Sequence, residues 1–247
     1  MCQGTQCGGA AAETMAAERL VDSMRAWPER RSVRISIAAL VRIKDDDRHV
    51  LVHSLSRPGS YGPPGGVYKY FTPAIGILED LGFRPDRADS LVGDMRADLR
   101  GFLPVSSLRG FLRWFATGAY REDFVECLRR ELAEELAEVD LGRLAPVTSE
   151  LVFTHVRTVV EGPQPVPGRS FLQLRRYEVY DLVATGEIAD RFRWQLIEAG
   201  QDDAVTGVIC ATTEQIRHGR IGPALIGGHS AYLIDTRRIH PDLPMVR

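Results

Sequence analysis

The chain has 247 residues, of which 44% are hydrophobic and 26% charged, a composition typical of a globular domain with a substantial core. Its formal net charge of −2 gives no overall attraction to nucleic acid or to an anionic membrane, so neither is expected as a partner. The four cysteines are too few and too scattered for a disulfide framework, and there is neither a secretory signal nor an apolar stretch of about 18 residues. These features predict a cytoplasmic protein.

The predicted elements begin with a leader that contains a short helix over residues 12–26. Ile35, Ile37, Val41 and Ile43 share one face, which predicts a strand over Val33–Ile43 that forms a hairpin with a second strand over Val50–Leu55. The later elements, in chain order, are a Gly/Pro loop (61–66), helical patches (73–81, 107–115), a long helix (121–139), strands (150–160, 171–183, 206–211), a short helix capped by Thr212 and Gln215, and a last helix (223–233). This mixture predicts an α+β sandwich.

The long helix carries the strongest pattern in the chain. At about 100° per residue, with Leu128 as the origin, its apolar side chains share an arc of about 120°; these are Phe124, Val125, Leu128, Leu132, Leu136 and Val139. Four acids lie beside that arc, at about −60° for Glu131, −120° for Glu134, −20° for Glu135 and −80° for Glu138. Glu135 therefore points into the edge of the core face.

Such clustering of acids costs free energy. Like charges at i,i+4, such as Glu131 and Glu135, destabilise a helix by roughly 0.2–0.5 kcal/mol per pair, and partial burial raises that cost. A Mg²⁺ ion would relieve both effects, because it takes carboxylate oxygens as ligands and bridges them to phosphates. A solvated acidic face is the competing interpretation, but it does not explain an acid at the edge of the core.

The same segment resembles the Nudix box, Gly-x5-Glu-x7-Arg-Glu-U-x-Glu-Glu-x-Gly-U, in which U is aliphatic. Glu122 is followed, after seven residues, by Arg130-Glu131-Leu132-Ala133-Glu134-Glu135, so six specified positions match in order. The resemblance covers residues 33–235. It implies an α+β protein with the Nudix fold, an α/β/α sandwich with a mixed sheet.

The chain departs from the box at both glycines. In the family the first glycine follows a Pro-Gly-Gly loop and precedes the first glutamate by six residues, whereas Gly66 lies 56 residues before Glu122. The closing glycine is replaced by Ala137. The expected organisation is therefore a leader with a short helix (1–32) and a Nudix domain (33–247) with a helical insertion (67–118) between the Gly-Gly loop and the Nudix helix.

A split box of this kind resembles the SMODS-associated Nudix family, which is found alongside bacterial antiphage systems that signal with cyclic oligonucleotides. Four groups of residues support this resemblance: Tyr61 to Gly66, Asp98-Leu99-Arg100, Trp114-Phe115 and Arg121-Glu122.

The resemblance implies that Mg²⁺, with Mn²⁺ as an alternative, is bound by Glu131, Glu134, Glu135 and the carbonyl oxygen of Gly65 or Gly66. The metal would withdraw charge from the phosphoryl oxygens and activate a water for attack at phosphorus. The acceptor of the water's proton is left open among Glu131, Glu135, Asp202 and Asp203.

Two further residues of the box have an implied supporting role in catalysis. Glu122 would pair with Arg130, and this pair would hold the helix–loop geometry and orient Glu131. For ligand contact the insertion offers Tyr68, Lys69, Arg100 and Trp114, together with Tyr70 and Arg113. Ordinary packing is the favoured alternative for the aromatic residues.

Two functions from different classes follow. The first is a Mg²⁺-dependent hydrolase that cleaves the pyrophosphate bond of a nucleotide or another nucleoside diphosphate derivative, in antiphage nucleotide signalling. The alternative is a non-catalytic Nudix-fold protein that senses a nucleotide, and the intact acids Glu131, Glu134 and Glu135 weigh against it. A homodimer is compatible with both functions.

Overall fold

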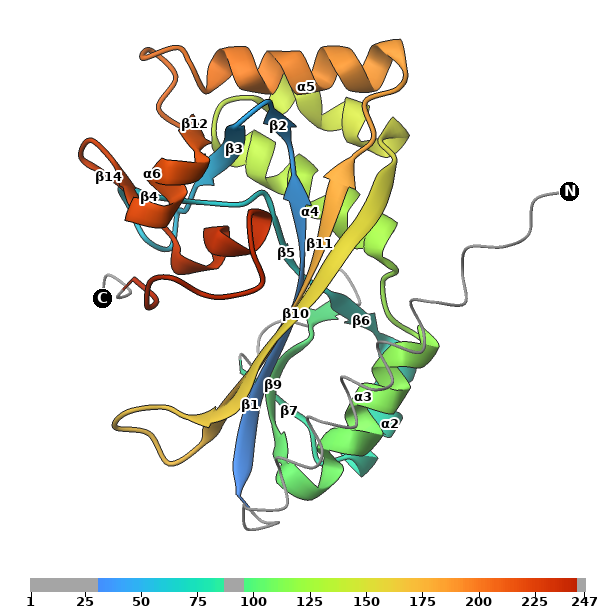
Figure 1. Ribbon diagram of the computed structural model, residues 1–247. Coiled ribbons are helices and arrows are strands. Elements are labelled where there is room, and N and C mark those ends of the chain that lie inside the picture. Colours follow the sequence, from blue (N-terminus) through green and yellow to red (C-terminus); the bar gives the residue numbers. More distant parts are fainter. Residues whose placement is uncertain (1–30, 87–95, 244–247) are drawn as a thin grey trace, which may run out of the picture. The chain divides into compact units, whose positions relative to one another are not determined.

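The computed structural model describes residues 31–86 and 96–243, which form two compact units (Figure 1). Of the described residues, unit 1 contains 31–37, 69–86, 96–122 and 160–175. Unit 2 contains 38–68, 123–159 and 176–243. The strands β1, β10 and β11 contribute residues to both units. The predicted leader helix lies outside the described residues.

Unit 2 contains the second half of β1 (Ser32–Arg42), paired with β5 (Gly65–Val67) in a sheet of order β10-β11-β1-β9-β7. A second sheet has the order β12-β3-β4-β14-β13, with β2 paired to β3. In this sheet β14 and β4 run parallel and the other pairs are antiparallel, so the sheet is mixed. The other strands that belong wholly or partly to unit 2 are β10 (Phe153–Pro165), β11 (Leu172–Leu182), β2 (Lys44–Asp45), β3 (Arg48–His53), β4 (Ser60–Gly62), β12 (Val208–Thr212), β13 (Arg220–Ile221) and β14 (Ala224–Ile226).

The core of unit 2 contains residues from strands of both sheets. Leu40 on β1 and Val179 on β11 belong to the same buried cluster as Leu51 on β3 and Ala211 on β12. Burial of a Leu or Val side chain contributes about 1.5–3 kcal/mol, so this cluster is a main source of the unit's stability.

The helices of unit 2 are α4 (Phe124–Glu138), α5 (Glu187–Ala199) and α6 (Thr213–His218), with 3₁₀ segments η4 (Gly142–Glu150) and η5 (Gly228–Leu233). A capping box of Asp123 and Glu126 begins α4, so this helix starts later than the pattern predicted. The predicted box of Thr212 and Gln215 at the start of α6 is confirmed. Leu128, Leu132 and Leu136 of α4 are buried, as its apolar arc predicted.

Unit 1 contains the two helices expected from the helical patches, α2 (Ile75–Asp80) and α3 (Leu108–Thr117). Its shorter elements are β6 (Lys69–Phe71), η1 (Thr72–Ala74), β7 (Arg84–Pro85), β8 (Arg96–Asp98), β9 (Arg100–Pro104) and η3 (Val105–Ser107). Aromatic rings fill its interior: Phe83 stacks on Phe111 at 5.6 Å, and Phe111 contacts Trp114 at the same ring separation. Most of the predicted insertion, 67–118, belongs to this unit.

The α+β fold with a mixed sheet is confirmed, but three local predictions are wrong. The predicted hairpin of Val33–Ile43 with Val50–Leu55 does not form, because β1 and β3 lie in different sheets and the short strand β2 pairs with β3 instead, through a turn at Asp46 with a φ of 49°. The predicted helix over 223–233 is instead the strand β14 followed by the 3₁₀ segment η5, since Gly227 and Gly228 interrupt the pattern. The helix α5 was missed, although Phe192, Leu196 and Ile197 give it a buried face. Within the described ranges no helix is long and apolar enough to cross a membrane.

The burial of His49 on β3 predicts that the folded protein loses stability at acidic pH. Its side chain is 4% exposed, its Nδ1 has no hydrogen-bond partner in the described part of the chain, and burial followed by the charges of Arg42 and Lys44 lowers its pKa to about 4. The unfolded chain therefore binds a proton that the folded chain excludes. Stability should fall between about pH 6.5 and pH 4, by up to about 1.4 kcal/mol per pH unit.

Denaturant unfolding at several pH values measures this effect. His49→Leu should flatten the slope in that window, whereas His218→Asn, at an exposed position on α6, should keep it. An unchanged slope in His49→Leu would show that other groups cause the loss.

Candidate functional site

The candidate site is the contact of α4 with β5, and both elements belong to unit 2. Cys127, Glu131 and Glu135 are four residues apart on α4 and therefore lie in one row on the helix surface. The Cys127 thiol lies 3.8 Å from the carbonyl oxygen of Gly66. One turn later the Glu131 carboxylate lies directly against Gly66, and after another turn Glu135 Oε2 accepts the N–H of Gly65 at 3.0 Å.

The two glycines are required by this contact, each for its own reason. Gly65 has a φ of 122°, and a Cβ on it would come closer than 3.0 Å to the carbonyl oxygen of Ala39. On Gly66 a Cβ would come closer than 3.0 Å to all three carboxyl atoms of Glu131. Side chains at these positions would separate β5 from β1 or from α4.

Arg130 organises the acids around it. Its Nη1 donates to Glu131 Oε1 at 2.8 Å and to Glu134 Oε2 at 3.1 Å, and its Nη2 donates to the carbonyl oxygen of Val67 at 3.0 Å. The Glu131 side chain is 17% exposed, whereas that of Glu134 is 50% exposed. One guanidinium therefore ties two predicted metal ligands to the strand.

Glu135 is held in an environment that disfavours its charge. Burial raises the pKa of its carboxyl well above the ordinary range, and the nearby charges of Glu131, Glu138 and Glu134 raise it further, although the N–H of Gly65 opposes the change. A cation beside this carboxylate would favour the ionised form.

The donor set fits a hard divalent cation. Glu131 and Glu135 supply carboxylate oxygens next to the glycines, and oxygen ligands are those that such cations prefer. Glu134 lies on the more exposed side and is engaged by Arg130. As placed in the described ranges, no three Asp, Glu, His or Cys side chains already form a metal-binding group. Ligation by Glu131, Glu134, Glu135 and Gly66 stays a prediction.

Glu122 belongs to unit 1 and is completely buried there. Its Oε2 accepts the N–H of Lys69 at 2.9 Å, and its Oε1 lies 3.3 Å from Nη1 of Arg96. Its own N–H donates to the carbonyl oxygen of Lys69, so the two residues are joined by two hydrogen bonds. The pairing of Glu122 with Arg130 stays a prediction.

The four residues proposed for substrate contact have different exposures. Tyr68 is 1% exposed, and its hydroxyl donates to Glu178 at 2.5 Å; Trp114 is buried in the aromatic interior of unit 1. Burial favours a packing role for both. Lys69 and Arg100 are half-buried, and their contact with substrate stays a prediction.

Sequence reasoning missed two contributors to this contact, Cys127 and the carbonyl oxygen of Val67. Cys127 precedes Glu131 by one helical turn, which was a usable signal for its position in the row. A backbone carbonyl has no such signal, because every residue has one.

The environment of Glu135 gives a testable stability change. The pKa of Glu135 is raised in the folded protein, so the unfolded chain releases this proton at a lower pH than the folded chain does. The folded state therefore loses stability as the pH rises above the ordinary glutamate range, and the loss is present at neutral pH. Without divalent cations, Glu135→Gln should therefore raise stability at pH 7, by about 1 kcal/mol or roughly 2–4 °C in Tm.

Thermal unfolding in a chelating buffer checks this change, and Glu150→Gln at an exposed position of η4 is the control. If Glu135→Gln lowered the Tm while Glu150→Gln did not, the result would contradict the claim that the Glu135 carboxylate destabilises the folded state.

Comparison with known protein families identifies the family of this chain. The family model described as the SMODS-associated NUDIX domain matches residues 32–234, which is most of the chain and includes β5 and α4. No curated protein matches the chain. NUDIX domains are in general hydrolases of phosphorus-containing anhydrides that use divalent metals. The chain belongs to the SMODS-associated NUDIX family.

Proposed function

We propose that the protein is a Mg²⁺-dependent hydrolase that cleaves the pyrophosphate bond of a nucleoside diphosphate-linked substrate. The observation that carries this proposal is the row on α4, where Glu131 lies against Gly66 and Glu135 accepts the N–H of Gly65. Family membership adds the reaction class. On the family's association alone, we also propose a role in antiphage nucleotide signalling.

The residues of the site have different proposed roles. Glu131, Glu134 and Glu135 would hold the cation, which when bound supplies charge withdrawal from the phosphoryl oxygens. Arg130 keeps Glu131 and Glu134 in place through its bonds to both carboxylates and to Val67. We assign Glu135 as the acceptor of the water's proton, because its carboxylate lies beside the glycines of β5, where a bound cation would keep it ionised and able to accept a proton.

Incubation with a panel of nucleoside diphosphate-linked compounds and Mg²⁺ or Mn²⁺ tests the proposal, with released monophosphate as the readout. Turnover that stops on chelation supports a hydrolase. Tight binding without turnover favours the nucleotide sensor, and neither binding nor turnover overturns both functions.

The first mutational prediction concerns the carboxylates. Glu135→Gln should lower kcat by about 10²-fold or more, because it removes both a cation ligand and the proton acceptor. It should leave the folded state intact, as checked by thermal unfolding. Glu150→Gln is the matched control with unchanged turnover, and full activity in Glu135→Gln would sink the assignment.

The second concerns the close approach of β5 to α4. Gly66→Ala should lower kcat by about 10-fold or more, because its methyl group must displace the Glu131 carboxylate. Gly76→Ala is the control, since a Cβ there meets no atom within 4 Å and alanine is favoured in a helix. Equal rates for the two variants would contradict the role of the contact.

A further inference from the structure

A groove lies beyond the C-terminal end of α4, entirely within unit 2. It consists of two adjoining cavities of about 430 and 210 Å³, which share Val139, Asp140, Thr206 and Gly207. The larger cavity is also lined by residues of α5 and of the loop that follows it, and the smaller one by His53 and Tyr61. The volume of the larger cavity is in the range of small-molecule sites.

The walls of the groove are fixed by close contacts. A Cβ on Gly207 would come closer than 3.0 Å to the side chain of Val139, so this loop packs tightly on the end of α4. The Tyr61 hydroxyl donates to the carbonyl oxygen of Thr206 at 2.5 Å. Tyr61 also packs edge-on against His53 at 5.4 Å, and the pair forms an aromatic side of the smaller cavity. These contacts hold the walls of the groove in place.

The charge of the lining is strongly unbalanced. Four acids line it, Glu138, Asp140, Glu198 and Asp202, and among the described residues Arg143 is the one Lys or Arg side chain in the lining. Within the part of the chain that the structure describes, Glu138, Asp140 and Glu198 make no ion pair, and Asp202 accepts only the N–H of Ala204. The groove is thus lined by exposed carboxylates that give it a negative potential.

The groove begins one turn after the carboxylates of the candidate site. Glu138 follows Glu135 by three residues, which is a rise of about 4.5 Å along α4. Seven residues separate Glu138 from Glu131, so both lie on the same side of the helix, about 20° apart. A group attached to a pyrophosphate at Glu131 and Glu135 would reach this groove.

We infer that the groove takes the part of the substrate beyond the scissile pyrophosphate, and that it selects a group that is uncharged and rich in hydroxyl or amino donors. The inference rests on the proposed function and names its substrate class. A further phosphate on that group is excluded, because four carboxylates repel it and only Arg143 attracts it. Hydroxyl or amino groups, in contrast, donate to Asp140, Glu198 and Asp202.

Two substrates that differ by one phosphate test this inference. ADP-ribose should be cleaved with a kcat/KM at least about 10-fold above that of its analogue with a phosphate on the adenosine ribose or on the terminal ribose. Both analogues are assayed, because either the adenosine or the terminal ribose of the molecule can occupy the groove. The discrimination should shrink at high ionic strength, since it is electrostatic.

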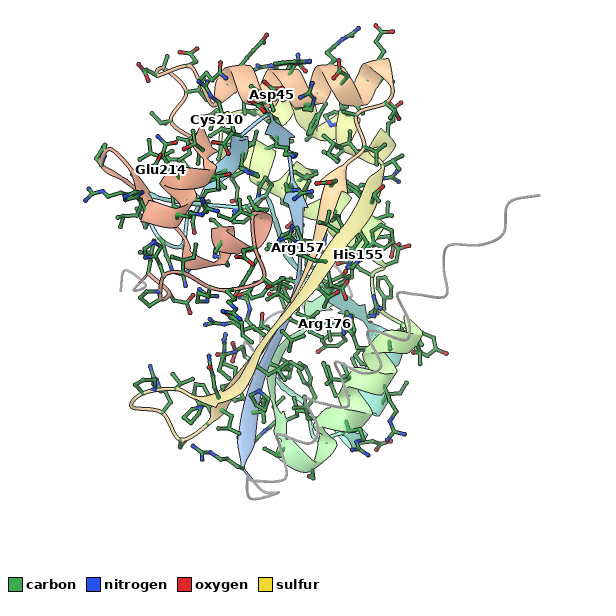
Figure 2. All side chains as sticks on the ribbon, in the orientation of Figure 1. Asp45, His155, Arg157, Arg176, Cys210 and Glu214 are labelled. Carbon is green, nitrogen blue, oxygen red and sulfur yellow. The ribbon has the colours of Figure 1, made fainter. Side chains whose placement is uncertain are left out.

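Variants of the groove test whether its acids cause the discrimination against the phosphorylated analogues. Glu198→Gln combined with Asp202→Asn should raise the relative kcat/KM of the phosphorylated analogue several-fold, because it removes two repelling charges. Glu214→Gln, an exposed acid on α6 (labelled in Figure 2), is the matched control and should leave the ratio unchanged.

The outcomes separate this inference from the proposed function. Cleavage of ADP-ribose and both analogues at equal rates overturns the inference and leaves the hydrolase standing. If none is cleaved with Mg²⁺ or Mn²⁺, calorimetric binding of the same compounds decides: tighter binding of the unphosphorylated compound supports the groove in a sensor, and equal binding or none overturns it.

Discussion

The functional part of this protein depends on how closely one helix approaches one short strand. Glu131 and Glu135 contact β5 only because Gly65 and Gly66 have no side chains, and Gly65 is required again by its left-handed φ of 122° and by its approach to β1. Two carboxylates are therefore held beside backbone groups instead of in open water. Such desolvation costs free energy in the absence of a cation, and a bound cation returns it.

The site combines an unfavourable charge arrangement with rigid support. Glu131, Glu134, Glu135 and Glu138 occupy neighbouring turns of α4, and Arg130 offsets part of their repulsion while anchoring itself on Val67. Clusters of neighbouring carboxylates are common where a ligand is bound. The groove that follows on the same helix extends the negative potential past the predicted metal ligands, so under the proposed function one end of the substrate would meet a cation and the other end a set of acceptors.

The two units differ in how far their residues could be assigned a role from sequence. In unit 1 the aromatic residues form a packed interior, in which Phe83, Phe111 and Trp114 contact one another. Aromatic side chains in an insertion are equally suited to packing and to base stacking, and only their burial distinguishes the two. Glu122 is similar, because its sequence position indicated a supporting role but not its bonds to Lys69 and Arg96.

The sequence by itself determined the fold class, the position of α4, its buried face and the family, because helical periodicity and the spacing of the box residues are local properties of the chain. Only the tertiary structure decided that Gly66 lies under Glu131, that Glu135 bonds to Gly65 and that α5 and the 204–207 loop complete a groove at the end of α4. These contacts join residues about 50 to 70 positions apart in the chain, and no local pattern encodes which of them meet, since packing and chain closure act on the whole fold.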